Sequence, residues 1–134
     1  MKYLFDTTAY SELLRGRKEI AMLLNEADSI LLPNVVIAEL QYGFQFGTKL
    51  SENEKLLSKF LANKKVHALL PDNATTGYFV NIAVVARKKG IQLSSHDIWI
   101  AALTEQWESI LVSSDKDFVH LSYESLKLYS FDQI

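Results

Sequence analysis

The sequence predicts an α/β fold in which a parallel sheet is covered by helices on both faces. Short apolar segments of strand length recur along the chain, and longer segments with helical periodicity separate them. The predicted strands, such as Ile110–Ser113, are continuously apolar, which is typical of strands buried on both faces. The chain has 134 residues and is 49% hydrophobic, so we expect one domain with one core, spanning residues 1–134.

The first half of the chain predicts two strands, each followed by helices. Lys2–Asp6 is a short apolar strand that ends in an acid, and the helix after it has Thr7 or Thr8 as its cap and stops at Gly16. The remaining elements of this half are a helix over Ile20–Glu26, a strand over Ser29–Leu32, a break at Pro33, and a helix over Val35–Phe46 that ends near Gly47.

The second half continues the alternation. Ser51–Glu54 has the pattern of a capping box, which predicts a helix running from there to about Lys64. The clearest amphipathic helix is Ala74–Lys89, which Gly90 closes. The other elements are strands over Val66–Leu70, Ile110–Ser113 and Leu126–Tyr129, and a helix over Asp97–Trp107 that opens from Ser94–His96.

Composition excludes several classes of function. The chain has no cysteine, which rules out disulfides, thiol chemistry, cysteine-ligated zinc and iron–sulfur clusters. No segment reaches the roughly 20 apolar residues that span a bilayer, and the acid at Asp6 leaves no room for a signal peptide. We therefore expect a cytoplasmic protein with no membrane partner. The net charge of −2 gives no overall basic field, and we interpret the clusters of basic residues as solvated helix ends.

Acidic residues stand where a parallel sheet places its sites. Asp6 follows the first predicted strand, Asp115 follows the strand over Ile110–Ser113, Asp97 begins a helix, and Glu39 lies within an apolar run. Ligand sites in such folds form outside the carboxyl ends of the strands. Crowded carboxylates resist ionising together, and a divalent cation removes that cost. Oxygen ligands of this kind suit Mg²⁺ or Mn²⁺.

Each acid also has a structural interpretation when taken alone. Asp97 can cap its helix, Asp6 can begin a turn, and Glu39 can be a solvated helix residue. Asp115 and Asp117 can both cap a short turn. Of these two we expect Asp115 to reach the metals, because it leaves the strand end, and Asp117 to serve as a turn or cap residue before Phe118–Leu121.

Four segments, in order, carry a resemblance to a known family. Leu4–Thr8, Ala38–Gly43, His96–Ala102 and Ser113–Phe118 resemble the four motifs of PIN domains, and the second and third especially resemble the VapC-type toxins of bacterial toxin–antitoxin pairs. Two positions depart from the family pattern. Thr8 stands where Asn or Ser is usual, and His96 stands where Asn is common.

The resemblance implies a fold, a reaction and partners. The fold is a three-layer α/β/α sandwich around a central parallel sheet of four or five strands. The reaction is metal-dependent endonucleolytic cleavage of RNA, often a tRNA or rRNA, with Mg²⁺ or Mn²⁺ held by the acids Asp6, Glu39, Asp97 and Asp115. Thr8, Ser113, His96 and Asp117 are expected to support those acids. The implied partners are a second copy of the chain and a small inhibitory antitoxin protein.

Other interpretations remain open. An Asp-based phosphotransfer domain also places an acid at a strand end, but Thr8 occupies the place of the second Asp of the dehalogenase signature, and Pro33-Asn34 lacks the acid of a receiver domain. A PIN fold that only binds partners is the second alternative. Apolar helix faces over Ile20–Leu24 and Val35–Tyr42 suit either an antitoxin groove or, preferably, the core, and Trp99 is expected in the core.

Overall fold

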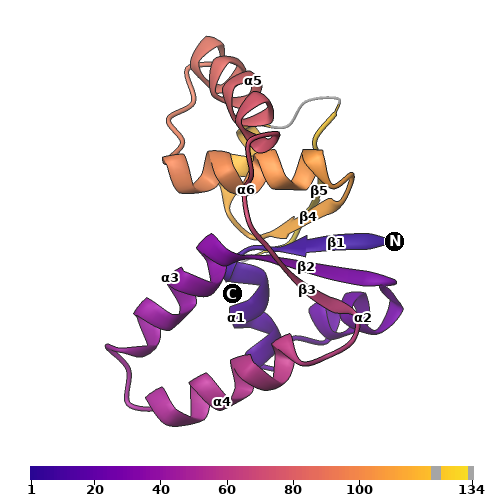
Figure 1. Ribbon diagram of the computed structural model, residues 1–134, viewed down its shortest axis with the longest axis vertical. Coiled ribbons are helices and arrows are strands. Elements are labelled where there is room, and N and C mark those ends of the chain that lie inside the picture. Colours follow the sequence, from indigo (N-terminus) through magenta and orange to yellow (C-terminus); the bar gives the residue numbers. More distant parts are fainter. Residues whose placement is uncertain (122–124, 133–134) are drawn as a thin grey trace.

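The computed structural model describes residues 1–121 and 125–132 as one parallel sheet with helices on both sides (Figure 1). Its five strands are β1 (Lys2–Phe5), β2 (Ser29–Pro33), β3 (Val66–Leu69), β4 (Ile110–Ser113) and β5 (Lys127–Ser130). They lie in the order β3-β2-β1-β4-β5, and every neighbouring pair is parallel. The predicted α/β/α sandwich is confirmed, with five strands rather than four.

The helices form the two outer layers. In the described part of the chain they are α1 (Thr7–Leu14), α2 (Lys18–Glu26), α3 (Asn34–Phe44), α4 (Leu50–Leu61), α5 (Thr75–Lys88), α6 (Ser95–Gln106) and α7 (Lys116–Leu121). Figure 1 shows α1 to α4 on one side of the sheet and α5 with α6 on the other. Among the described helices, none is long and apolar enough to cross a membrane.

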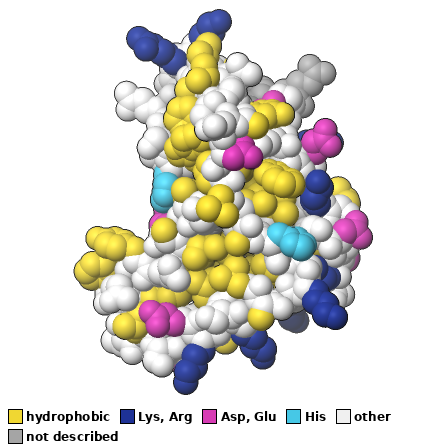
Figure 2. Space-filling view, viewed as in Figure 1, with side chains coloured by type: hydrophobic (Ala, Val, Ile, Leu, Met, Phe, Trp, Pro, Cys, Tyr) yellow, Lys and Arg dark blue, Asp and Glu magenta, His cyan; other side chains and the backbone are white. Residues whose placement is uncertain are grey.

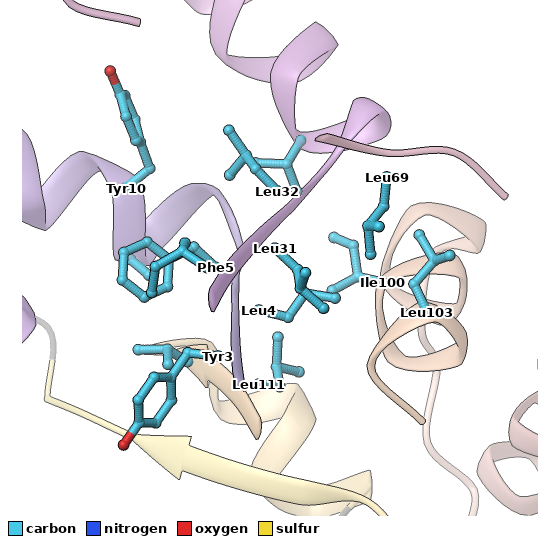
Figure 3. Close-up of a cluster of buried hydrophobic side chains, with 14 of the residues drawn as sticks. Tyr3, Leu4, Phe5, Tyr10, Leu31, Leu32, Leu69, Ile100, Leu103 and Leu111 are labelled. Atoms are coloured by element: carbon cyan, nitrogen blue, oxygen red, sulfur yellow. The ribbon is translucent and has the colours of Figure 1, made fainter. Parts of the chain in front are cut away.

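Alternation along β1 divides the core between the two faces of the sheet. Leu4 lies with Leu31 and Leu111 on the face toward Ile100 of α6, and Phe5 lies on the other face near Tyr10 (Figure 3). All six side chains are buried. Burial of the central strands on both faces explains why their sequences are continuously apolar.

The strand order creates a switch point beside β1. From β1 the chain moves outward through β2 to β3, and it then crosses back to β4, which pairs with the other edge of β1. Connections leave in opposite directions at the carboxyl ends of β1 and β4, which opens a crevice there. Asp6 follows β1 and Asp115 follows β4, so both acids stand at this crevice.

Two predicted helix caps were wrong. The cap of α1 is Asp6, whose Oδ1 accepts a hydrogen bond from the backbone N–H of Ala9 at 2.9 Å, rather than Thr7 or Thr8. A carboxylate accepts helix N–H groups well, and here the strand passes directly into the helix. The capping box at Ser51–Glu54 does not form, because α4 begins at Leu50 and the backbone carbonyl of Lys49 accepts the bond from Asn53 N.

The remaining boundaries differ from expectation by a few residues. Helix α6 begins at Ser95 rather than Asp97, and helix α4 ends at Leu61 rather than near Lys64. Strand β5 lies one residue later than predicted. Gly16 and Gly90 end their helices as expected, with φ of 83° and 71°, a backbone region that favours glycine.

Candidate metal centre

Asp6 is a buried carboxylate held by three hydrogen bonds. It is 4% exposed. Its Oδ1 accepts from the Thr8 hydroxyl at 2.6 Å and from the backbone of Ala9, and its Oδ2 accepts from the Ser113 hydroxyl. The orientation of the Asp6 carboxylate is therefore fixed from both sides of the crevice, by α1 and by β4.

The same hydroxyls fix the loop that follows β4. Ser113 Oγ accepts from the backbone N–H of Asp115 at 3.0 Å, and Thr8 Oγ1 accepts from the backbone N–H of Ser114 at 3.0 Å. Each hydroxyl thus donates to Asp6 and accepts from the loop. Thr8 and Ser113 are two of the residues that the resemblance implies as supports for the acids.

Three further carboxylates gather at the same end of the sheet. Asp97 lies in the first turn of α6, Asp115 follows β4, and Asp117 lies in the first turn of α7. One oxygen from each of the three lies within 4.8 Å of the others. That spacing is short enough for all three to touch one ion.

Capping roles in this region differ from those considered for the sequence. Ser94 caps α6, because its hydroxyl accepts a hydrogen bond from Asp97 N at 3.2 Å. The Asp97 carboxylate is therefore not the cap of this helix. Asp115 Oδ1 accepts from Asp117 N at 2.9 Å, so Asp115 caps the turn into α7. The expectation that Asp117 is the cap was wrong, because the side chain at the strand exit reaches the free N–H first.

Glu39 stands at the margin of this group. It lies on α3, and its Oε2 is 2.9 Å from Nδ1 of His96, which lies on α6. Both side chains are about half exposed, at 44% for Glu39 and 42% for His96. His96 is therefore a helix residue that ties the second motif to the third, rather than a loop histidine.

Burial and like charges disfavour ionisation in the centre. Burial raises the pKa of Asp6, the hydrogen bonds from Ser113, Thr8 and Ala9 lower it in part, and the charge of Asp115 raises it again. Burial also raises the pKa of Asp97, with Ser94 opposing and Asp115, Asp117 and Glu39 adding to the rise. The acids are therefore close enough for the charge of one to affect the ionisation of another.

The donor set fits a hard divalent cation. The clustered ligands are carboxylate oxygens, the chain has no cysteine thiolate, and this is the chemistry that Mg²⁺ and Mn²⁺ prefer. A bound cation would also offset the burial and the like-charge repulsion that raise the pKa values of Asp6 and Asp97. The residues that would hold it are Asp97, Asp115 and Asp117, with Asp6 beside them.

Sequence reasoning named every carboxylate of this centre but gave one of them only a supporting role. Asp6, Asp97 and Asp115 meet at the switch point, and Glu39 approaches through His96. The Asp117 carboxylate joins the cluster, although we assigned it to a turn. Its spacing of two residues from Asp115 at the start of a short helix was the available signal, because a tight first turn folds the second acid back. Trp99 packs on Phe79 with ring centroids 4.5 Å apart, but it is only half-buried and lies outside the hydrophobic core, so the expected core role was wrong.

Comparison with known proteins assigns the fold to a family. The sequence profile of the PIN domain matches residues 3–122, so the chain belongs to the PIN-domain family, whose members are nucleases. A comparison with curated proteins gave no match.

Solved structures with the same fold come from toxin–antitoxin complexes. VapBC2 of Rickettsia felis, bound to a DNA fragment from its promoter, is 22% identical with a TM-score of 0.81, and the match covers 98% of this chain and 100% of that one. VapBC-1 of nontypeable Haemophilus influenzae is 21% identical with a TM-score of 0.81, covering 97% and 98%. VapC20 of Mycobacterium tuberculosis, a toxin that cleaves the sarcin–ricin loop, is 13% identical with a TM-score of 0.68, covering 93% and 98%.

Proposed function

We propose that this protein is a metal-dependent endoribonuclease and the toxin of a toxin–antitoxin pair. The observation that carries the proposal is the meeting of Asp97, Asp115 and Asp117 beside the buried Asp6, at the switch point of a PIN-domain sheet. Four acids from three separate parts of the chain have no structural need to converge. A cation site would explain why these acids meet.

Each residue then has a role in the proposed site. When bound, Mg²⁺ or Mn²⁺ activates water and stabilises the oxygen that leaves the phosphodiester. Asp97, Asp115 and Asp117 hold the cation from the α6 and β4 sides, and Asp6 faces it from β1. Ser113 and Thr8 fix the direction of Asp6 through their hydrogen bonds. Glu39 reaches the margin of the site, where His96 holds it.

RNA is the proposed substrate. VapC20, which shares the fold, is described as cleaving the sarcin–ricin loop, and that loop is structured RNA. Structured RNA such as tRNA or rRNA is therefore the first substrate class to test, in the cytoplasm, where these molecules are found.

A small antitoxin is the proposed protein partner, since similar structures are complexes of a toxin with its antitoxin. An apolar groove of about 260 Å³ runs between α1 and α4, and its lining includes Leu13, Leu14, Leu56 and Phe60. We assign antitoxin docking to this groove. The helix faces considered from sequence are core instead, because Ile20, Leu23, Val36 and Leu40 are buried.

To inhibit cleavage, the antitoxin also needs a group that binds to the acidic centre. An arginine suits this task, because its planar guanidinium matches carboxylates with two parallel hydrogen bonds.

A homodimer is proposed as well. Large apolar side chains remain exposed on α5 at Val80 and Val84 and at the end of α3, where Tyr42 and Phe46 stack edge to face. Figure 2 shows hydrophobic side chains protruding beside α3.

The test is cleavage of purified tRNA and rRNA by the antitoxin-free protein. We expect internal cuts with Mg²⁺ or Mn²⁺, mapped by primer extension, and none after EDTA treatment. A non-catalytic binding module would bind RNA without cutting it. Cleavage that persists in EDTA, or no cleavage of any structured RNA, contradicts the proposal.

A further inference from the structure

A small polar pocket adjoins Asp6 on the side of α1. It is lined by Thr7, Thr8, Ser11, Glu12 and Arg15 from α1 and by Ser114 from the loop after β4, and its volume is about 150 Å³. A water molecule occupies about 30 Å³ of the liquid, so the pocket has room for several waters or for a group larger than one water. The Thr8 hydroxyl that lines it also donates to Asp6 Oδ1, so the pocket and the acidic centre share a wall.

Glu12 is unusual because it is a charged residue that is buried in the middle of a helix. It is 8% exposed, and its Oε1 accepts a hydrogen bond from Arg15 Nη1 at 2.6 Å. A carboxylate offers about four acceptor positions, so one such bond leaves Glu12 with acceptor capacity toward the pocket that it lines. Arg15 itself is 70% exposed, so its guanidinium faces solvent at the mouth while Glu12 anchors it.

The hydroxyl of Thr7 adds a second polar group to the same wall. Its Oγ1 is fully buried and has no hydrogen-bond partner among residues 1–121 and 125–132. Threonine inside a helix usually bonds to a carbonyl of the preceding turn, but Thr7 is the first residue of α1 and has no such turn behind it. A buried polar group without a partner is costly, so Thr7 carries an unmet hydrogen bond behind the wall of the pocket.

On the basis of the proposed nuclease function, we propose that this pocket binds the ribose 2′-hydroxyl and neighbouring phosphate of an RNA strand beside the cleaved bond. The Glu12 carboxylate accepts a hydrogen bond from the 2′-hydroxyl, with the Ser11 side chain beside it. The exposed guanidinium of Arg15 pairs with the phosphate. DNA lacks the 2′-hydroxyl and leaves Glu12 without that donor, so the pocket selects RNA over DNA.

The inference is tested by binding without metal, which separates the pocket from the acidic centre. A dye-labelled RNA hairpin and the DNA hairpin of the same sequence are titrated in EDTA, and affinity is read from fluorescence anisotropy. Glu12→Gln keeps the shape of the side chain and removes its charge. We expect the ratio of RNA affinity to DNA affinity to fall by about tenfold, since hydrogen bonds to charged groups are worth at least that much. If Glu12→Gln lowers the melting temperature of the protein, Ser11→Ala is the second variant to test. It should also lower the ratio of RNA affinity to DNA affinity, but by a smaller factor.

Arg15→Ala is expected to behave differently. It removes a phosphate contact, so affinity for both hairpins should fall by a similar factor, and the salt dependence of binding should weaken by about one counterion. Arg87→Ala is the matched control, because Arg87 is an exposed arginine on α5. It should leave both affinities and the RNA preference unchanged.

Several results would overturn the assignment. An unchanged ratio in both Glu12→Gln and Ser11→Ala, equal binding of RNA and DNA by the wild type, or no binding of either hairpin would each refute the ribose contact. Equal behaviour of Arg15→Ala and Arg87→Ala would refute the phosphate contact. Failure of the nuclease function looks different: the wild type would bind RNA with a preference that depends on Glu12 and yet leave it uncut with Mn²⁺.

Discussion

The hydroxyl of Ser113, at the end of β4, donates a hydrogen bond to Oδ2 of Asp6, which follows β1. The two strands are neighbours in the sheet, with Phe5 opposite Val112. The same hydroxyl accepts from Asp115 N, so one side chain links the buried acid to the loop that carries another. The relative placement of the acids therefore depends on this contact.

Replacement of Ser113 should disturb activity more than the fold. Ser113→Ala removes the donor to Asp6 and the acceptor for Asp115 N, so we expect turnover on RNA to fall on the order of 10- to 100-fold, as for other residues that orient metal ligands. Stability should fall by about 1–3 kcal/mol, because polar groups lose buried partners. Ser51→Ala, at an exposed position of α4, is the control. If Ser113→Ala keeps wild-type turnover, Ser113 does not orient Asp6 for the reaction.

Asp6→Asn should abolish turnover while the fold is kept. Asparagine is as good a helix cap as aspartate, so α1 retains its first hydrogen bond. The negative charge that faces the cation is lost. Cleavage assays and circular dichroism on the same preparation check both statements, and wild-type turnover would refute the assigned role of Asp6.

Without metal, Asp6 should make stability depend on pH. Its pKa is raised in the folded protein above the unfolded value of about 3.9, so the folded state holds the proton more tightly. The contribution of Asp6 to the free energy of unfolding in EDTA should therefore be highest below about pH 4 and should fall as pH rises through the folded pKa. Asp6→Asn should flatten this dependence, and at neutral pH it should be the more stable protein. Urea unfolding at a series of pH values measures this, and parallel curves for the two proteins would contradict it.

Asp115 and Asp117 should differ in their importance for the metal. The charge of Asp115 affects both Asp6 and Asp97, and that of Asp117 affects Asp97. Asp115→Asn should therefore weaken Mn²⁺ binding and cut turnover severely, and Asp117→Asn should do so less. Alanine at position 115 should also cost about 1 kcal/mol of stability, because it removes the cap of α7. If Asp117→Asn is the more damaging to Mn²⁺ binding, our order of the two acids is wrong.

A charge in the groove between α1 and α4 should block the antitoxin without stopping the nuclease. Leu14 and Leu56 line the groove and are about 40% exposed, at 39% and 40%, so Leu14→Glu or Leu56→Glu should be tolerated by the fold. Co-expression with the adjacent small open reading frame should then yield toxin without antitoxin in affinity purification. Met22→Glu is the control, at an exposed position of α2. Recovery of the complex at the wild-type level would rule out this groove.

Much of the fold and site could be predicted because the governing patterns are local. The buried strands are continuous apolar runs, Gly16 and Gly90 end helices, and Asp6 and Asp115 directly follow strands. The missed features depend on geometry in three dimensions. Asp6 caps α1 because its side chain points back from the strand end, and Asp117 joins the cluster because α7 folds it back toward Asp97. The pocket beside Glu12 combines a helix face with a loop about 100 residues later in the chain, and no local pattern shows that.

Titration with Mn²⁺ tests the central claim most directly, since that claim is that the acids at the switch point form a divalent cation site. Isothermal calorimetry compares the wild type with Asp97→Asn, which removes a carboxylate from the centre of the cluster, and with Asp28→Asn, an acid that pairs with the amino terminus outside the cluster. We predict that the wild type and Asp28→Asn bind Mn²⁺ alike and that Asp97→Asn binds it more than about tenfold more weakly, a difference of about 1.4 kcal/mol or more. Equal Mn²⁺ affinity in the wild type and Asp97→Asn would contradict the account.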